Sequence, residues 1–281
     1  MQEEVINWES IWAKLYEERE RKIKRKETGI EVWDKAAERF SESRKGNDYE
    51  YGRKVADVLY EVITPESEVL EIGAGPGTFV IPFARTVKNV TAVEPSNGML
   101  EYLIRNAEEA GVENFELITK KWEDIDLSKI GGKFDLVIST IVAWMFKDIW
   151  NYLERMEKAS KGYCCLVEGI GEYKEGRFDE LWQKVTGKEY SEWSKTYPDS
   201  NFFYNILYNR ERFANVGIIN YATQRSVDGW VRFMEDFFDG YITEMTPEVR
   251  GIIREHAIEN ADDGMIKSQN SAAVIWWKAK V

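Results

Sequence analysis

The chain has 281 residues, 43% of them apolar and 14% aromatic, so it has enough apolar material for a folded core. Its 50 acidic residues outnumber its 38 basic residues, and the net charge of −12 argues against a surface that binds nucleic-acid phosphates. No uncharged apolar run approaches the roughly 18 residues of a membrane span, and the amino terminus lacks a signal-peptide pattern. We therefore expect a cytoplasmic protein that does not bind membranes.

Three helices are predicted before the first strand. Apolar residues recur at helical spacing within 8–28, 31–40 and 51–63. We interpret residues 1–47 as a helical extension in front of the main domain, which begins at residue 48.

From residue 68 onward, short apolar runs alternate with helical segments. This alternation is typical of a largely parallel sheet with helices on both faces. The intervening helices are expected to begin near Thr78, near Asn97 and at Ile141 or Phe146. The expected strands are 68–72, 89–94, 115–119, 134–139 and 163–168. In the last of these, the adjacent Cys164 and Cys165 would point to opposite faces, which predicts neither a disulfide nor a metal site.

After Gly169 the alternation stops. Ten of the 36 residues from 173 to 208 are aromatic, about twice the 14% of the whole chain. We interpret 171–212 as an aromatic insertion and 213–281 as the rest of the main domain. That last part contains two expected strands and two expected helices, at 216–223 and 271–280 and at 227–238 and 247–260.

The turn after the first expected strand is the most specific motif. Residues 69–80 read VLEIGAGPGTFV, so Gly73, Gly75 and Gly77 alternate between an apolar strand and an apolar helix. Such a turn lets a backbone approach a nucleotide cofactor closely. The third glycine comes one residue too early for the dinucleotide fingerprint, so a pyrophosphate is not required.

Glu94 ends the second expected strand, 21 residues after Gly73. A carboxylate at this place can accept hydrogen bonds from both hydroxyls of a ribose. The alternative interpretation is a tight turn followed by a solvated strand end. Three alternating glycines together with acids at positions 71 and 94 favour a bound cofactor that contains adenosine.

These residues resemble the class I S-adenosylmethionine-dependent methyltransferases, whose first motif is an acid, one residue and three alternating glycines. The resemblance covers about residues 48–170. AVEPSNGML at 92–100 resembles the second motif of the family, and ITKKWEDI at 118–125 resembles the third. The third motif departs from the family because Lys121 occupies the place of the usual aspartate. This departure leaves the adenine contact open between Trp122 and Glu123.

The resemblance implies an α/β fold with a Rossmann-like, seven-stranded methyltransferase sheet, helices on both faces and the strand order 3-2-1-4-5-7-6, with strand 7 antiparallel. It also implies S-adenosylmethionine as the cofactor and S-adenosylhomocysteine as its product. Met99 and Trp122 remain open between contacting the adenine and packing in the core. The implied cofactor-binding residues are Glu71, Gly73, Ala74, Gly75, Gly77, Glu94, Pro95, Met99, Trp122, Glu123, Ser139 and Thr140.

Methyl transfer requires alignment of donor and acceptor in a dry pocket. We expect the extension 1–47 and the insertion 171–212 to cover that pocket as lids. If a base is needed, Glu168 and Tyr173 are the best-placed candidates. The single histidine, His256, is expected to be a solvated helix residue. The residues expected to line the acceptor pocket are Tyr49, Tyr51, Trp144 and Tyr173.

The sequence therefore predicts a methyltransferase that acts on a small-molecule acceptor in an aromatic pocket, without a metal. Two alternatives remain. The acceptor is a protein or peptide side chain, or the chain binds the cofactor without catalysis. The sequence identifies neither the methylated atom nor the oligomeric state.

Overall fold

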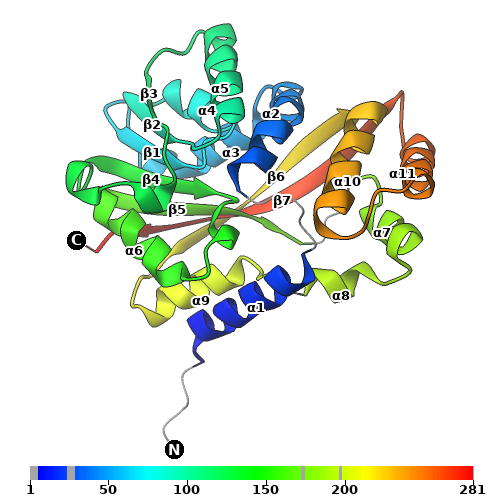
Figure 1. Cartoon of the computed structure of the whole chain (residues 1–281). Helices are drawn as coiled ribbons and strands as arrows, with labels where there is room; N and C mark the ends of the chain where they lie inside the picture. The colour runs from blue at the N-terminus through cyan, green and yellow to red at the C-terminus, as the bar shows by residue number, and fades with distance from the viewer. Residues whose placement is uncertain (1–5, 24–28, 172–174, 196–197, 281) are drawn as a thin grey trace, which may run out of the picture.

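The computed structural model describes residues 6–23, 29–171, 175–195 and 198–280, which include one seven-stranded sheet with helices on both faces (Figure 1). The strands are β1 (Glu68–Ile72), β2 (Asn89–Val93), β3 (Phe115–Ile118), β4 (Phe134–Thr140), β5 (Ser160–Ile170), β6 (Asn215–Ser226) and β7 (Met265–Lys278).

The strand order is β3-β2-β1-β4-β5-β7-β6, with β7 antiparallel to both of its neighbours. The first five strands pair in parallel. Both the expected order and the reversed last strand are confirmed. Since β1 lies between β2 and β4, the carboxyl ends of these three strands meet at one edge, where ligands of such sheets bind.

Strands β6 and β7 are longer than the sequence pattern indicated. They remain paired from Asn215 opposite Trp276 to Ser226 opposite Met265. The outer half of this ribbon extends past the other strands and carries polar residues (Figure 1). It therefore lacks the apolar run by which a buried strand is identified.

Two layers of helices cover the sheet. On one face, α3, α4 and α5 pack on the strands, and α2 packs against α5. On the other face, α6 packs on the strands, with α1 and α9 beside it (Figure 1). These helices are α1 (Trp8–Lys22), α2 (Ile30–Lys45), α3 (Glu50–Val58), α4 (Val80–Ala84), α5 (Asn97–Ala110), α6 (Ile149–Ala159) and α9 (Asn201–Asn209).

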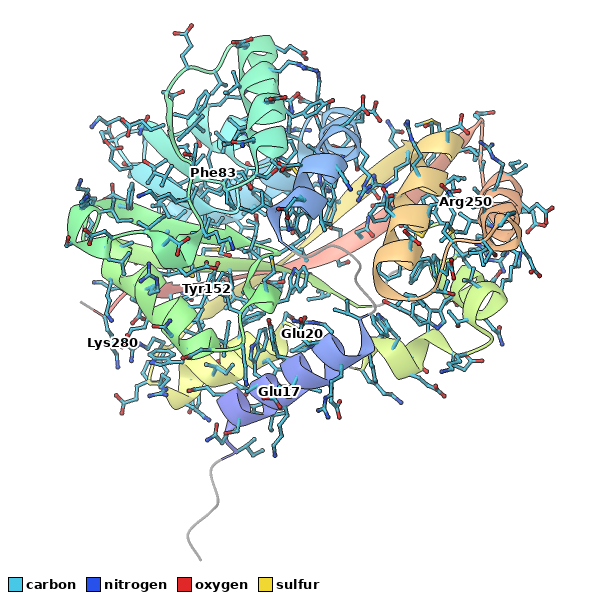
Figure 2. The ribbon with its side chains drawn as sticks, viewed as in Figure 1. Glu17, Glu20, Phe83, Tyr152, Arg250 and Lys280 are labelled. Atoms are coloured by element: carbon cyan, nitrogen blue, oxygen red, sulfur yellow. The ribbon has the colours of Figure 1, made fainter. Side chains whose placement is uncertain are left out.

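Apolar side chains fill both layers, as Figure 2 shows with Phe83 in the first and Tyr152 in the second. Neighbouring strand residues alternate between the layers, so both faces of the parallel strands are buried. Cys165 lies in the first layer and Cys164 in the second, as expected, and both thiols are free and buried.

A third apolar cluster lies beside the outer part of the β6–β7 ribbon. Its largest buried side chains include Trp182, Trp230 and Phe238. The segment 171–212 is thus divided, because two of its helices join this cluster while α9 lies beside α1. The helices of the cluster are α7 (Phe178–Thr186), α8 (Tyr190–Ser194), α10 (Val227–Tyr241) and α11 (Pro247–Glu259).

The expectation that His256 is solvated is wrong, because this side chain is fully buried on α11. Its Nδ1 lies 3.2 Å from the Lys184 ammonium and its Nε2 lies 2.7 Å from the Gly176 carbonyl oxygen. An ammonium only donates, so Nδ1 accepts and Nε2–H donates to the carbonyl. The charged Arg254 and Glu255 directly before His256 favoured a solvated position, whereas its partners Lys184 and Gly176 are distant in the sequence.

None of the described helices is long and apolar enough to cross a membrane.

Candidate active site

The glycine turn follows β1 and has positive φ values of 75°, 52° and 91° at Gly73, Gly75 and Gly77. A Cβ atom at Gly73 would lie 2.3 Å from the Val142 side chain, so a larger residue does not fit there. At Gly75 the nearest atom to an added Cβ would be the Met99 sulfur, at 4.0 Å. The face of the turn at Gly75 is therefore open.

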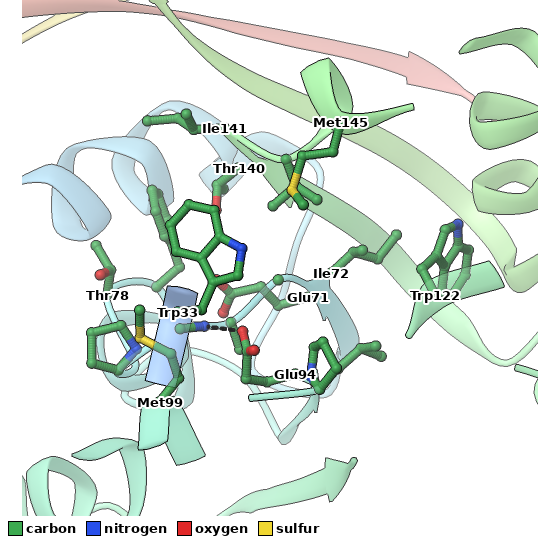
Figure 3. A pocket seen from close by; sticks show the side chains of 18 of the residues that line it. Trp33, Glu71, Ile72, Thr78, Glu94, Met99, Trp122, Thr140, Ile141 and Met145 are labelled. Atoms are coloured by element: carbon green, nitrogen blue, oxygen red, sulfur yellow. Dashed lines mark hydrogen bonds between the residues drawn. The ribbon is translucent and has the colours of Figure 1, made fainter. Parts of the chain in front are cut away.

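Glu94 connects the end of β2 to this turn. Its carboxylate accepts hydrogen bonds from the backbone N–H groups of Gly75, at 2.9 Å, and Ser96, at 2.8 Å. The first of these is the dashed line in Figure 3. Burial raises the pKa of Glu94, while the two backbone N–H groups oppose that rise. Each oxygen keeps capacity for a further hydrogen bond.

Glu71 faces the same space, and within the part of the chain that the structure describes neither of its carboxyl oxygens has a hydrogen-bond partner at normal distance and angle. Its side chain is 1% exposed. Burial, followed by the nearby Glu94, raises its pKa well above the usual range, which the backbone N–H of Val80 offsets only in part. A buried polar group without a partner is costly, so this carboxyl indicates a missing ligand.

A cavity of about 390 Å³ lies at the carboxyl ends of β1, β2 and β4 (Figure 3). Gly77 does not line it, because this glycine packs near Ile81 and Leu103. Ser139 is also absent from the lining, and its hydroxyl is 2.6 Å from that of Tyr152 in the second layer. The structure brings the other ten expected cofactor residues together around the cavity: Glu71, Gly73, Ala74, Gly75, Glu94, Pro95, Met99, Trp122, Glu123 and Thr140.

Two of the four expected acceptor residues, Tyr51 and Trp144, also line the cavity. Tyr49 is buried in the first layer and does not reach it. Tyr173 lies outside the described residues. None of the described residues in 171–212 lines the cavity.

Helix α2 supplies cavity residues that the sequence analysis did not identify individually: Trp33, Phe40 and Arg44. Their spacing of seven and four residues places them on one face of the helix, which is the signal that could have revealed them. The Arg44 guanidinium lies 5.6 Å from the centre of the Tyr51 ring. It forms no ion pair with any residue that the structure describes.

Asp34 fixes α2 beside Glu94 and Met99. Its carboxylate accepts hydrogen bonds from the Ser96 hydroxyl, at 2.6 Å, and from the Gly98 backbone N–H, at 2.9 Å. A Cβ at Gly98 would lie 2.8 Å from the Asp34 backbone, so the two helices touch directly. Helix α2 is therefore a wall of the cavity on the Glu94 side.

Helix α1 holds the segment that follows β4. The Trp12 indole donates to the Phe146 carbonyl at 2.8 Å, and the Arg19 guanidinium donates to the Trp144 carbonyl at 2.6 Å. Arg19 also lies 5.1 Å from the centre of the Trp144 ring. Both α1 side chains are 1% exposed. The segment contributes five residues to the cavity lining, and α1 binds the backbone of two of them, Trp144 and Phe146.

Ile141 begins that segment with a positive φ of 53°, which is unfavourable for a β-branched residue. Its N–H donates to the Val167 carbonyl at 3.0 Å, and its own carbonyl accepts from the Trp144 indole at 2.9 Å. Strain that neighbouring hydrogen bonds maintain is typical of functional sites.

A second buried carboxyl group that has no hydrogen-bond partner among the described residues lies at the end of β5. Glu168 is 8% exposed, and its Oε1 has no hydrogen-bond partner. Burial raises the pKa of Glu168 to about 8, with no contribution from a neighbouring charge.

Comparison with known proteins agrees with this geometry. Residues 69–161 match the family model of a methyltransferase domain. The chain is 36% identical over 254 residues to an uncharacterized protein of Haemophilus influenzae, which covers 87% of this chain and 88% of that one.

Two solved structures are similar in fold. A Bacillus halodurans protein assigned as a methyltransferase has a TM-score of 0.53 and 16% identity, over 81% of this chain and 99% of its own. A Methanococcus maripaludis protein assigned as an S-adenosyl-L-methionine-dependent methyltransferase has a TM-score of 0.51 and 16% identity, over 69% of this chain and 90% of its own.

The reversed strand β7, the glycine turn and Glu94 together define a Rossmann-like methyltransferase. The chain belongs to the class I S-adenosylmethionine-dependent methyltransferases, in one family with the Haemophilus influenzae protein.

Glu94→Ala is predicted to weaken binding of S-adenosylhomocysteine by roughly 1.5 to 3 kcal/mol, because two ribose hydroxyls lose a charged acceptor. Gly75→Val should weaken binding further by filling the open face of the turn. Titration calorimetry measures both effects, and Glu101→Gln, an exposed carboxylate change on α5, serves as the control. Wild-type affinity in both folded variants would contradict this assignment.

Arg19→Ala is predicted to loosen the segment after β4 without disturbing the glycine turn. Hydrogen exchange of residues 141–147 should become faster, while affinity for S-adenosylhomocysteine stays within about threefold, under ~1 kcal/mol. Lys22→Ala, an exposed change on the same helix, should alter neither quantity. Unchanged exchange in Arg19→Ala would show that α1 does not hold this segment.

Glu168→Gln is predicted to stabilise the protein at alkaline pH. The pKa of Glu168 is about 8 in the folded protein and near 4.5 in the unfolded chain, so the folded protein holds this proton more tightly. Below pH 4.5 both states are protonated, and as the pH rises from there to about 8 the free energy of unfolding of the wild type falls. The variant should therefore match the wild type at pH 4.5 and exceed it above pH 8, by at most about 5 kcal/mol. Urea unfolding at the two pH values tests this, and equal stability at the higher pH would contradict it.

Proposed function

We propose that the enzyme methylates a small molecule held inside the cavity, rather than a side chain of a protein or peptide. The main observation in support is that the cavity has walls on two sides: one is α2, and the other is the segment after β4, which α1 holds through two hydrogen bonds. The cavity volume of about 390 Å³ lies in the range of small-molecule sites. In this proposal the two walls cover the acceptor. A protein or peptide acceptor would instead need an open groove through which its side chain reaches the cofactor.

The residues present suit S-adenosylmethionine, which carries two ribose hydroxyls, an ammonium, a carboxylate and a sulfonium. Glu94 has free acceptor capacity for the hydroxyls, and the unpaired carboxyl of Glu71 suits the ammonium. Arg44 is the cavity cation nearest Tyr51 and suits the carboxylate. Met99 and Trp122 offer apolar surfaces to the adenine.

When bound, the cofactor supplies a methyl group on a positively charged sulfur. The part of the protein is to hold the acceptor in line with that methyl group and to exclude water. The rings of Trp33, Trp144 and Phe146 supply the apolar wall for both tasks. Ring faces also attract cations, which suits a positively charged acceptor.

The test supplies the enzyme with S-adenosylmethionine labelled in its methyl group and with an extract of Haemophilus influenzae, divided into a small-molecule filtrate and a macromolecular fraction. We expect the enzyme to transfer label to a compound in the filtrate, and Glu94→Ala to reduce that transfer at limiting cofactor. Label transferred to protein instead would refute the proposal.

A further inference from the structure

We infer that the methyl acceptor is an uncharged molecule with an apolar ring system. This inference rests on the proposed function and names the chemical class of its acceptor. The aromatic rings of the cavity by themselves suit either an apolar acceptor or a positively charged one. The charges and hydrogen bonds around the cavity decide between the two.

The place of the acceptor follows from the place of the cofactor. In the proposed function Glu94, after β2, binds the ribose, and Glu71 of β1 binds the ammonium. The next strand beyond β1 is β4, so the space beside the segment after β4 is left for the acceptor. In the view of Figure 3, Ile141 and Met145 lie on the opposite side of Glu71 from Glu94. The cavity residues of this segment, which we call the β4 wall, are Ile141, Val142, Trp144, Met145 and Phe146.

The charged residues of the cavity lie away from the β4 wall. Residues 141–146 read IVAWMF, and none of them is charged. Glu71 and Arg44 serve the cofactor in the proposed function, as does Glu94. The other two charged residues lie after β3, which β2 and β1 separate from β4 in the sheet. A charged acceptor beside the β4 wall would thus be buried without a partner, which is costly. Within the described part of the chain, the charged residues that line the cavity are Arg44, Glu71, Glu94, Lys121 and Glu123.

The main polar groups of the β4 wall are already hydrogen-bonded within the protein. The Trp144 indole N–H donates to the Ile141 carbonyl at 2.9 Å. Helix α1 donates to the carbonyls of Trp144 and Phe146, at 2.6 and 2.8 Å. The N–H groups of Met145 and Phe146 donate to carbonyls of the same turn, at 3.0 and 3.1 Å. The wall therefore presents mainly carbon atoms to the acceptor.

Two side chains of the β4 wall are exposed although they are apolar. Ile141 is 40% exposed and Met145 is 38% exposed, and both line the cavity. Exposed apolar surface beside a cavity is typical of a site where a ligand covers it. An apolar acceptor removes this surface from water, which is favourable.

The rings of the β4 wall favour another ring over a cation. The Arg19 guanidinium lies 5.1 Å from the centre of the Trp144 ring, so a cation already contacts that ring. The Phe146 ring stacks on Tyr152, with the ring centres 4.3 Å apart, which covers one of its faces. The other face and the edges remain for the acceptor. Because ring edges carry a partial positive charge, they attract the face of another ring and not a cation.

The test uses three probes of similar size that differ in charge. 1-Naphthalenemethanol is neutral, whereas at neutral pH 1-naphthylmethylamine is a cation and 1-naphthoic acid is an anion. Calorimetry measures the affinity of each probe for the enzyme saturated with S-adenosylhomocysteine, so that the cofactor site is filled. We expect the neutral probe to bind at least tenfold more tightly than either charged probe.

Met145→Glu places a carboxylate in the β4 wall at an exposed position, which the fold should tolerate. We expect the affinity of the neutral probe to fall at least tenfold and its advantage over the cationic probe to disappear. Ile104→Glu makes the same change on α5, at a side chain that is 41% exposed and does not line the cavity, and should keep all three affinities.

Two results overturn the inference. One is a charged probe that binds the wild type as tightly as the neutral probe, whether or not the variants fold. The other is a neutral probe that the wild type binds no better than folded Met145→Glu does.

The extract experiment separates this inference from the proposed function. We expect the labelled product in the small-molecule filtrate, once separated from residual cofactor, to pass from water into octanol at neutral pH. A labelled filtrate product that stays in water overturns only the uncharged, apolar acceptor. Label in protein refutes the small-molecule acceptor itself, whatever the probes show.

Discussion

The site depends on the absence of a side chain at Gly73. The segment after β4 packs so closely on the glycine turn that the Val142 side chain occupies the space of a Cβ. This contact joins two parts of the cavity lining: the glycine turn, with the residues expected to bind the cofactor, and the segment after β4, which forms the adjacent wall. Helix α1 then fixes that segment from outside through Trp12 and Arg19.

The central sheet was predictable because its signals are local. Each of the five parallel strands is a short, mainly apolar run of residues. The spacing of the three glycines and Glu94 along the sequence is the one that binding of a nucleotide cofactor requires. The role of α2 was not predictable in this way. It depends on Asp34 meeting Ser96 and Gly98, more than 60 residues away, and no periodicity encodes such a contact.

The same limit explains the other differences between sequence and structure. His256, Phe178 and Trp182 are buried by helices distant in sequence, so their surroundings could not be inferred from their neighbours. Ser139 lies one residue before the end of β4, at the edge of the sheet where the cavity is, but its hydroxyl contacts Tyr152 and it does not line the cavity. Adjacent residues of a strand point to opposite faces of the sheet, but this alternation does not tell which of the two faces contacts the ligand.

The order of the strands also constrains how the chain folds. β7 follows β6 in the sequence, yet it lies between β5 and β6 in the sheet. β6 therefore has no strand to pair with until β7 has been synthesised and inserted. Pairing of β5 with a strand so distant in sequence raises the contact order, which slows folding. During synthesis, β5 exposes an open edge that invites association with other chains, and closing it is a late step on the route to the active enzyme.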